Sequence, residues 1–176
     1  MKSLVVLYSY HHHNTEKVAK VIAKVLDAQI MAPQEVDPGG LQGYGLIGFG
    51  SGIYSERHHQ SLLDLADRMP KAADGRAFIF STSGAPSMAL SGEQLGKTVQ
   101  RFHSALRERL RAKGYAIVGE FLCPGLNTNS FLRYFGGLNK GRPNAEDLRH
   151  AEEFAQGLRI EASGPQVSKD RTDRLP

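Results

Sequence analysis

Short apolar runs alternate along the chain with stretches in which apolar residues recur every three or four positions. The runs are rich in β-branched and aromatic residues, and their length suits strands that are buried on both faces. They lie at residues 3–8, 28–32, 44–50, 76–82 and 115–122. The stretches with helical spacing lie at about residues 18–26, 59–69, 92–113 and 144–158. This alternation predicts an α/β domain with an open, doubly wound parallel sheet of five strands.

Two signals mark the limits of the longest predicted helix. Ser91 and Gln94 have the spacing of a capping box at its start, and Gly114 fits the left-handed position after its end. A long loop, residues 123–144, then connects the last strand to the last helix. Loops of this length are usually functional or disordered, and the aromatic residues of this one favour an ordered, functional loop.

The length and composition fit one globular domain. The chain has 176 residues, of which 40% are hydrophobic. We expect the domain to comprise residues 1–161 and a flexible polar tail to comprise residues 162–176. No apolar run approaches the roughly 20 residues that span a bilayer. Cys123 is the only cysteine, so an intrachain disulfide is excluded, and we expect a cytoplasmic protein in which this thiol is a small buried residue.

The charge balance is modestly basic. The formal net charge is +4 and the pI is about 9.3. Much of the excess lies in residues 107–113 and 169–174. A basic helix can bind nucleic acid, but no aromatic side chains interleave with these residues to stack on bases. We therefore expect a solvated basic face and no nucleic-acid partner.

The predicted topology places a ligand site before any motif is considered. In doubly wound sheets, ligands bind at the carboxyl ends of the parallel strands. The loops at that edge are residues 9–15, 50–57, 82–90 and 123–143, and most are rich in Ser, Thr, Gly or His.

The first of these loops contains three consecutive histidines, His11, His12 and His13, directly before a helix. A helix N-terminus with unpaired N–H groups favours a phosphate. The loop has no Lys or Arg, no GxGxxG pattern and no Walker A lysine, which favours a phosphomonoester held by neutral donors. Two alternatives stay open: a metal site completed by His58 and His59, and plain surface histidines.

The loop and its surroundings, YSYHHHNTE at residues 8–16, resemble the phosphate loop of the flavodoxin family. Three residues match that motif as they stand: Asn14, Thr15 and Glu16. Others depart from it, with Tyr10, His11 and His12 at Ser/Thr positions and His13 at the usual glycine.

Three further segments extend the resemblance in the same order. Residues 48–65 are similar to the loop and helix that hold one face of the flavin, and FIFSTSG at residues 78–84 is similar to the strand and loop beside its pyrimidine. Residues 136–155 are similar to the closing segment of a flavodoxin-like subgroup. The resemblance spans roughly residues 2–158 and implies a flavodoxin-like three-layer α/β/α sandwich.

The resemblance also implies FMN as cofactor and three sets of contacts. The phosphate would be held by the first loop, comprising Ser9, Tyr10, His11, His12, His13, Asn14 and Thr15. The isoalloxazine ring would be lined by Ser51, Gly52, Ile53, Tyr54 and Ser55. Backbone groups of Thr82, Ser83 and Gly84 would face the pyrimidine edge.

Many flavodoxins place the flavin between a Trp and a Tyr. This chain has no Trp, and its third loop has no aromatic residue, so we expect Tyr54 to stack on one face. The other face is either open or covered by Phe131 or Tyr134 of the long loop. A peptide near Gly52 is expected to hydrogen-bond the reduced ring.

Three functions follow, in order of preference. The first is an FMN-dependent electron carrier that docks on redox proteins. The second is an FMN-dependent reductase or oxidase acting on a quinone, a porphyrinogen or NAD(P)H, with the long loop as a lid. The third is a flavodoxin fold that binds another small phosphate ester. The basic balance weakens the first, because flavodoxins as a family are acidic.

The flavin would carry the chemistry, and we expect no side-chain general base. Neither a carboxylate dyad nor a Ser-His-Asp set is recognisable from spacing. Histidines beside a bound phosphate are favoured in their charged form, so we expect FMN binding to weaken as the pH rises through the histidine range.

Overall fold

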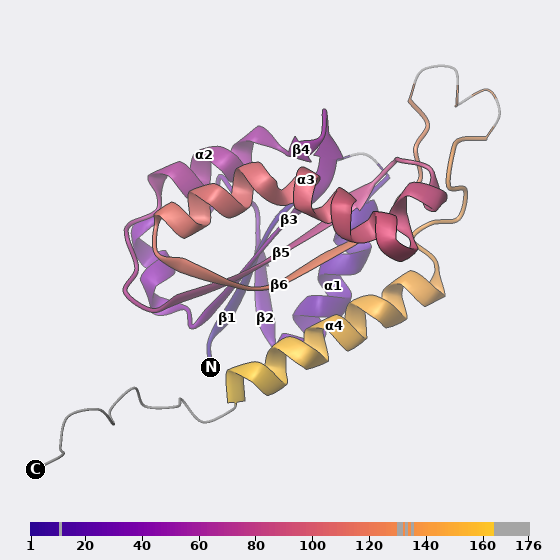
Figure 1. The fold of residues 1–176 in the computed structure, drawn as a ribbon. Coiled ribbons are helices and arrows are strands. Elements are labelled where there is room, and N and C mark those ends of the chain that lie inside the picture. The colour runs from indigo at the N-terminus through magenta and orange to yellow at the C-terminus, as the bar shows by residue number, and fades with distance from the viewer. Residues whose placement is uncertain (11, 130–131, 133, 135, 164–176) are drawn as a thin grey trace, which may run out of the picture.

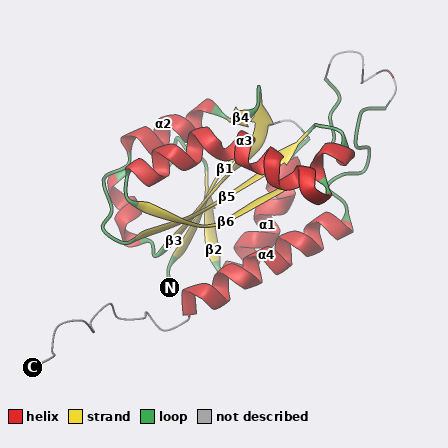
Figure 2. Ribbon diagram, in the orientation of Figure 1, coloured by secondary structure: helices red, strands yellow, loops and turns green. Residues whose placement is uncertain are grey.

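The computed structural model describes residues 1–163 except 11, 130–131, 133 and 135. A parallel sheet lies between two layers of helices (Figures 1 and 2). The helices and strands of the chain are, in order, β1 (Ser3–Tyr8), α1 (Asn14–Leu26), β2 (Ala28–Met31), the 3₁₀ helix η1 (Gly39–Gly43), β3 (Leu46–Tyr54), β4 (Arg57–His58), α2 (Gln60–Arg68), β5 (Gly75–Ser83), the 3₁₀ helix η2 (Ser87–Leu90), α3 (Gly92–Ala112), β6 (Tyr115–Pro124) and α4 (Ala145–Ser163).

The strand order β2-β1-β3-β5-β6 confirms the predicted doubly wound α/β fold. The chain first moves from β1 to β2 on one side, and then crosses to β3 on the other side of β1. The switch point therefore lies between β1 and β3, where the loops diverge and leave room for a ligand. Helices α1 and α4 cover one face of the sheet, and α2 and α3 cover the other (Figure 1).

Two glycines of β3 make room for two aromatic rings of β5. Gly48 pairs with Phe78 and Gly50 pairs with Phe80 in the parallel register. A Cβ on Gly48 would lie 2.1 Å from Phe78 Cζ, and one on Gly50 would lie 2.0 Å from Phe80 Cζ. Both rings are fully buried in the layer formed with α1 and α4. No side chain fits at either glycine while the rings stay in place.

The second predicted loop is shorter than expected because β3 continues through Tyr54. The chain turns at Ser55 and Glu56, whose φ values are 48° and 63°, and returns as β4, antiparallel to β3. Positive φ at both central residues is typical of a type I′ hairpin. A Ser-Glu pair is not the usual sequence of such a turn, and for this reason the sequence did not predict β4.

The helix-end predictions had mixed outcomes. Gly114 has a φ of +85° after α3, as predicted. Ser91 occupies the N-cap position of α3, but its side chain makes no capping hydrogen bond, so the capping box is wrong. At α4, Asn144 Oδ1 instead accepts hydrogen bonds from the N–H groups of Glu146 and Asp147.

Helix α4 ends at Ser163, two residues into the expected tail, and residues 164–176 of that tail lie outside the described residues. In the part of the chain that the structure describes, no helix is long and apolar enough to cross a membrane.

Candidate functional site

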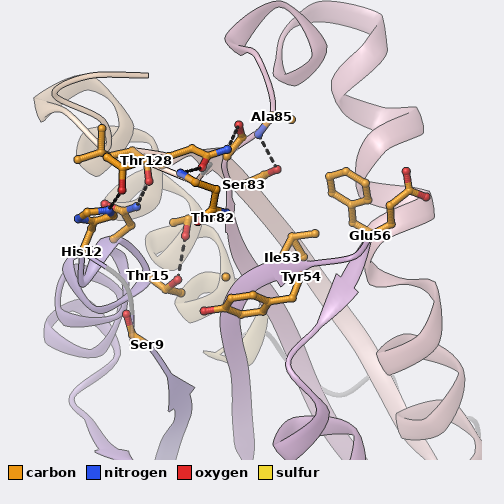
Figure 3. A pocket seen from close by; sticks show the side chains of 18 residues that line it. Ser9, His12, Thr15, Ile53, Tyr54, Glu56, Thr82, Ser83, Ala85 and Thr128 are labelled. Carbon is orange, nitrogen blue, oxygen red and sulfur yellow. Dashed lines mark hydrogen bonds between the residues drawn. The ribbon is translucent and has the colours of Figure 1, made fainter. Parts of the chain in front are cut away.

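A cleft of about 300 Å³ lies at the carboxyl ends of β1, β3, β5 and β6. All four loops at this edge contribute to its walls, together with Phe102 of α3 (Figure 3). Ten of the fifteen residues that the sequence predicted for a ligand site line it: Ser9, His12, Asn14, Thr15, Gly52, Ile53, Tyr54, Thr82, Ser83 and Gly84. The topology alone brings these residues together.

The polar wall is formed by the first loop and by the end of β5. Ser9 Oγ accepts a hydrogen bond from the N–H of Glu16 at 3.3 Å. The hydroxyl groups of Thr15 and Thr82 are 2.8 Å apart and buried, which ties the start of α1 to β5. This wall therefore offers neutral hydroxyl and amide groups at a helix N-terminus, an arrangement suited to an anion.

Asn14 has an unused acceptor at this wall. Its Nδ2 donates to the carbonyl of Leu126 at 3.0 Å, which fixes the orientation of the amide. Its Oδ1 is buried and has no hydrogen-bond partner among the described residues. A buried acceptor without a donor is costly, so a hydroxyl or N–H group of a ligand would stabilise this position.

The histidine run divides between the cleft and the surface. His12 and His13 both have left-handed backbones, with φ values of 55° and 52°. His12 lines the cleft, and its Nε2 lies 2.7 Å from Thr128 Oγ1. His13 instead bonds Glu16, with Nδ1 2.6 Å from Oε2, outside the cleft. His11 lies outside the described residues, and Tyr10 is 70% exposed and does not line the cleft.

The second wall is more apolar and comprises Ile53, Tyr54, Glu56 and Phe102. Tyr54 is half-buried, and burial followed by the neighbouring Tyr8 raises the pKa of its hydroxyl. Behind this wall, the rings of Tyr8 and His59 are stacked with centroids 3.5 Å apart and planes inclined by 6°. Both rings of this pair lie edge-on to the Tyr54 ring, at centroid distances of 6.5 Å for Tyr8 and 5.6 Å for His59.

Ser51 and Ser55 do not line the cleft. Ser55 is exposed in the hairpin turn, and Ser51 is fully buried beneath the wall. The Ser51 hydroxyl donates to the Gly52 carbonyl at 2.7 Å and accepts from the His59 N–H at 3.0 Å. Its single proton is thus used, so His58 Nδ1, 3.0 Å away, must be the donor to Ser51. Ser51 therefore positions the Gly52 peptide from below.

Sequence reasoning missed eight residues that line the cleft. They are Glu56, Ala85, Phe102, Gly125, Leu126, Asn127, Thr128 and Asn129. The last five begin the long loop that was expected to be functional, but nothing in the sequence indicated which part of it folds inward. The structure shows which contacts hold the long loop at the cleft. Asn127 Nδ2 donates to the Gly84 carbonyl at 3.2 Å, and Asn139 Nδ2 donates to the Ala85 carbonyl at 2.8 Å.

The other expected contributions of this loop are only partly described. Tyr134 is 74% exposed and does not line the cleft, so in this structure it does not cover a flavin face. Phe131 lies outside the described residues.

A buried polar network lies below the cleft. Ser81 Oγ is 2.8 Å from His103 Nε2, and His103 Nδ1 is 2.9 Å from Glu120 Oε2. Arg107 donates from Nε and Nη2 to the two Glu120 oxygens at 2.6 and 2.7 Å. Burial opposes ionisation of Glu120, but hydrogen bonds from Arg107 and His103 outweigh it and lower its pKa to about 2.

This chain of Ser81, His103 and Glu120 has the order of a Ser-His-acid triad, which sequence spacing did not reveal. Ser81 and His103 are both 0% exposed, so no substrate reaches the hydroxyl. The network instead connects β5, α3 and β6 beneath the cleft.

The histidines considered for a metal site lie apart. His58 is buried, and its ring centroid lies 4.9 Å from that of His103, whereas His59 stacks on Tyr8. Burial, and then the proximity of His103, lowers the pKa of His58 well below 6.5. Within the described residues, no group of three or more His, Cys, Asp or Glu side chains could hold a metal ion. Cys123 is buried, and burial raises the pKa of its thiol.

Comparison with solved structures finds proteins of similar fold. The chain is similar to oxidised flavodoxin 2 from Bacillus cereus, with a TM-score of 0.64, 17% identity and coverage of 92% of this chain and 99% of that one. It is also similar to a flavodoxin from the domain Archaea, with a TM-score of 0.60, 17% identity and coverage of 93% and 100%. The protein thus has a flavodoxin-like fold.

Sequence comparison then gives the family. No family model matches the chain. It is 44% identical over 158 residues to the uncharacterized protein MJ0298 of Methanocaldococcus jannaschii, covering 90% of this chain and 98% of the relative. The chain belongs to the same family as that protein.

Proposed function

We propose that the protein binds FMN in the cleft and carries electrons between redox partners. One observation carries this proposal: at the switch point of a flavodoxin-like sheet, a polar wall at the N-terminus of α1 faces a wall with Ile53, Tyr54 and Phe102. The first wall suits a phosphate and hydroxyl groups, and the second suits an aromatic ring. FMN has these groups at its two ends.

The residues of the cleft fit this cofactor. Thr15 and the N–H groups at the start of α1 would hold the phosphate. The unpartnered Asn14 Oδ1 would accept from a hydroxyl of the ribityl chain. Tyr54 would pack against the ring, and Thr82, Ser83 and Gly84 would offer backbone groups to its edge. Bound FMN supplies transfer of one or two electrons, and the protein holds it and excludes water.

The experiment compares FMN with riboflavin, which lacks the phosphate. The purified protein is freed of ligand and titrated with each flavin while its fluorescence is followed. We expect FMN to bind at least about a hundredfold more tightly, because only FMN reaches the helix N-terminus. Equal affinities would reject the phosphate site, and no binding of either flavin would reject the proposal.

A matched pair of variants locates the site. Asn14→Leu removes the unpartnered acceptor and is expected to weaken FMN binding at least about tenfold. Lys71→Ala changes an exposed residue between α2 and β5, at the opposite edge of the sheet, and is expected to leave the affinity unchanged. If both variants bind FMN as the wild type does, the ligand lies elsewhere.

An enzymatic role is the second candidate, because the long loop forms one wall of the cleft. It predicts that the FMN-loaded protein oxidises NADH or NADPH with a quinone in the absence of any added reductase. A carrier shows no such turnover and exchanges electrons only with a reduced or oxidised partner.

A further inference from the structure

Among the described residues near the cleft, three lysine and arginine side chains have no ion-pair partner. Lys17 lies in the first turn of α1, Arg57 follows the lining residue Glu56, and Lys140 follows Asn139. All three are exposed, and no carboxylate of the described residues lies within ion-pair distance of them. None of them lines the cleft, but Lys17 and Arg57 follow the lining residues Thr15 and Glu56 closely in the chain, and Lys140 belongs to the long loop, so all three lie near the edge of the cleft.

Most acidic residues at the same edge are already neutralised. Glu56 pairs with Arg101 at 3.4 Å and Glu93 pairs with Lys97 at 3.0 Å. Glu16 Oε1 lies 2.6 Å from Lys20 Nζ, and Asp147 pairs with Arg142. Glu146 is the one acidic residue of this edge, among those that the structure describes, for which no ion pair is found. The edge of the cleft is thus a positively charged surface.

Two large aromatic side chains add a second feature to this surface. Among the described residues, four large hydrophobic side chains are strongly exposed: Met1, Tyr10, Tyr134 and Ile160. Tyr10 belongs to the first loop and Tyr134 to the long loop, so both lie in segments that form the cleft edge. Exposed tyrosines beside complementary charges are typical of protein–protein interfaces.

We propose that this surface docks the acidic face of a redox protein, which exchanges electrons with the flavin inside the cleft. The inference rests on the proposed function and adds the chemistry of the partner. Uncompensated charges around a cleft steer an oppositely charged partner and raise its association rate. A nucleic-acid partner is less favoured, because a protein that binds duplex DNA can neutralise about 6–10 phosphates, whereas the part of this edge that the structure describes has three free cations.

The test measures electron transfer to the FMN-loaded protein from a reduced plant-type ferredoxin, an acidic one-electron donor, by stopped-flow absorption. Arg57→Glu and Lys140→Glu are compared with Lys71→Glu, which makes the same charge change at the opposite edge of the sheet. Lys17 is kept, because it lies beside the proposed phosphate site. At low salt we expect each cleft-edge reversal to slow the reaction about threefold or more, and Lys71→Glu to slow it much less.

Salt dependence gives an independent readout. The rates of all variants are expected to converge near 1 M salt, where the Debye length is about 3 Å. With cytochrome c, a basic oxidant of the reduced holoprotein, we expect the same reversals to raise the rate. The proposed docking surface would be rejected if all three charge reversals had equal effects on the rate, or if none of them had an effect.

Two further outcomes separate the possible failures. If the wild type retains no FMN, the proposed function and this inference both fail. If FMN-loaded variants transfer electrons at equal rates, the docking surface alone fails. Tight binding of duplex DNA at 0.15 M salt that the cleft-edge reversals abolish, without any effect on the ferredoxin rate, would overturn it in favour of a nucleic-acid surface.

Discussion

His12 Nε2 and Thr128 Oγ1 are 2.7 Å apart, although the two residues are separated by 116 positions in the chain. This hydrogen bond joins the first loop to the long loop at one side of the cleft (Figure 3). A ligand held by the first loop would therefore also lie beside the long loop.

Removal of this hydrogen bond is expected to loosen the site. Thr128→Val keeps the shape of the side chain and deletes its hydroxyl, so we expect the FMN dissociation constant to rise about three- to tenfold, as for loss of one hydrogen bond. Thr128→Ser keeps the hydroxyl and is the control. Equal affinities of the two variants in a fluorescence titration would mean that the hydrogen bond does not contribute to binding.

The backbone at His13 leads to a second prediction. Its φ of 52° lies in the left-handed region, which glycine adopts without strain. His13→Gly and His13→Ala both lose the bond to Glu16, but only glycine relieves the strain. We expect the glycine variant to be more stable than the alanine variant by roughly 1 kcal/mol in urea unfolding. Equal stabilities would show that the loop changes conformation in the variants.

The Arg107–Glu120 pair provides a third prediction. The Arg107 side chain is 7% exposed and that of Glu120 is 16% exposed. Arg107→Leu would leave the Glu120 carboxylate largely buried without its main partner, and we expect it to lower the free energy of unfolding by about 3 kcal/mol. The double variant with Glu120→Leu removes the unpaired charge and is expected to recover part of that loss. A double variant less stable than the single one would contradict this account.

A fourth prediction concerns the pH dependence of stability. Burial lowers the pKa of both His58 and His103 in the folded state, so below pH 6.5 the unfolded chain binds more protons than the native protein. This contribution to stability is fully present above about pH 6.5 and decreases as the pH falls, by up to about 1.4 kcal/mol per pH unit for each histidine. Urea midpoints measured from pH 8 to pH 5.5 give the slope.

A pair of histidine variants identifies the source of this slope. His58→Asn keeps a donor to Ser51 and removes the titrating ring, so we expect a flatter profile together with some loss of stability at pH 8. His150→Asn changes an exposed histidine of α4 and is expected to keep the wild-type slope. An unchanged slope in His58→Asn would assign the effect to other groups.

Glu120 adds a further pH dependence of stability at lower pH. Because its folded pKa of about 2 lies below the usual 4.5, stability falls further as the pH decreases below 4.5.

The sequence was sufficient to predict the layers of the fold, because buried parallel strands and amphipathic helices have distinct periods. It also placed most of the cleft, because strand ends of one sheet must meet at one edge. The hairpin at Ser55 and Glu56 was missed, since its left-handed turn uses neither glycine nor asparagine. The residue types of a turn do not indicate its conformation when tertiary contacts impose a backbone that those residues do not favour by themselves.

Contacts between distant segments were the least predictable part. Thr128 meets His12 in a long loop that the amides of Asn127 and Asn139 hold against the residues after β5. Ser81, His103 and Glu120 likewise come from three elements with unrelated local patterns. No spacing rule connects them, so the Ser-His-acid chain below the cleft became visible only in three dimensions.

The fit between Gly48 and Phe78, and between Gly50 and Phe80, also limits how this family can diverge. Each pair shares one volume, so neither member can change alone without a clash or a cavity. Relatives that carry a larger residue at position 48 or 50 should carry a smaller one at its partner position. Correlated substitution of these pairs would therefore mark chains that keep the same sheet register, even where the loops around the cleft have changed.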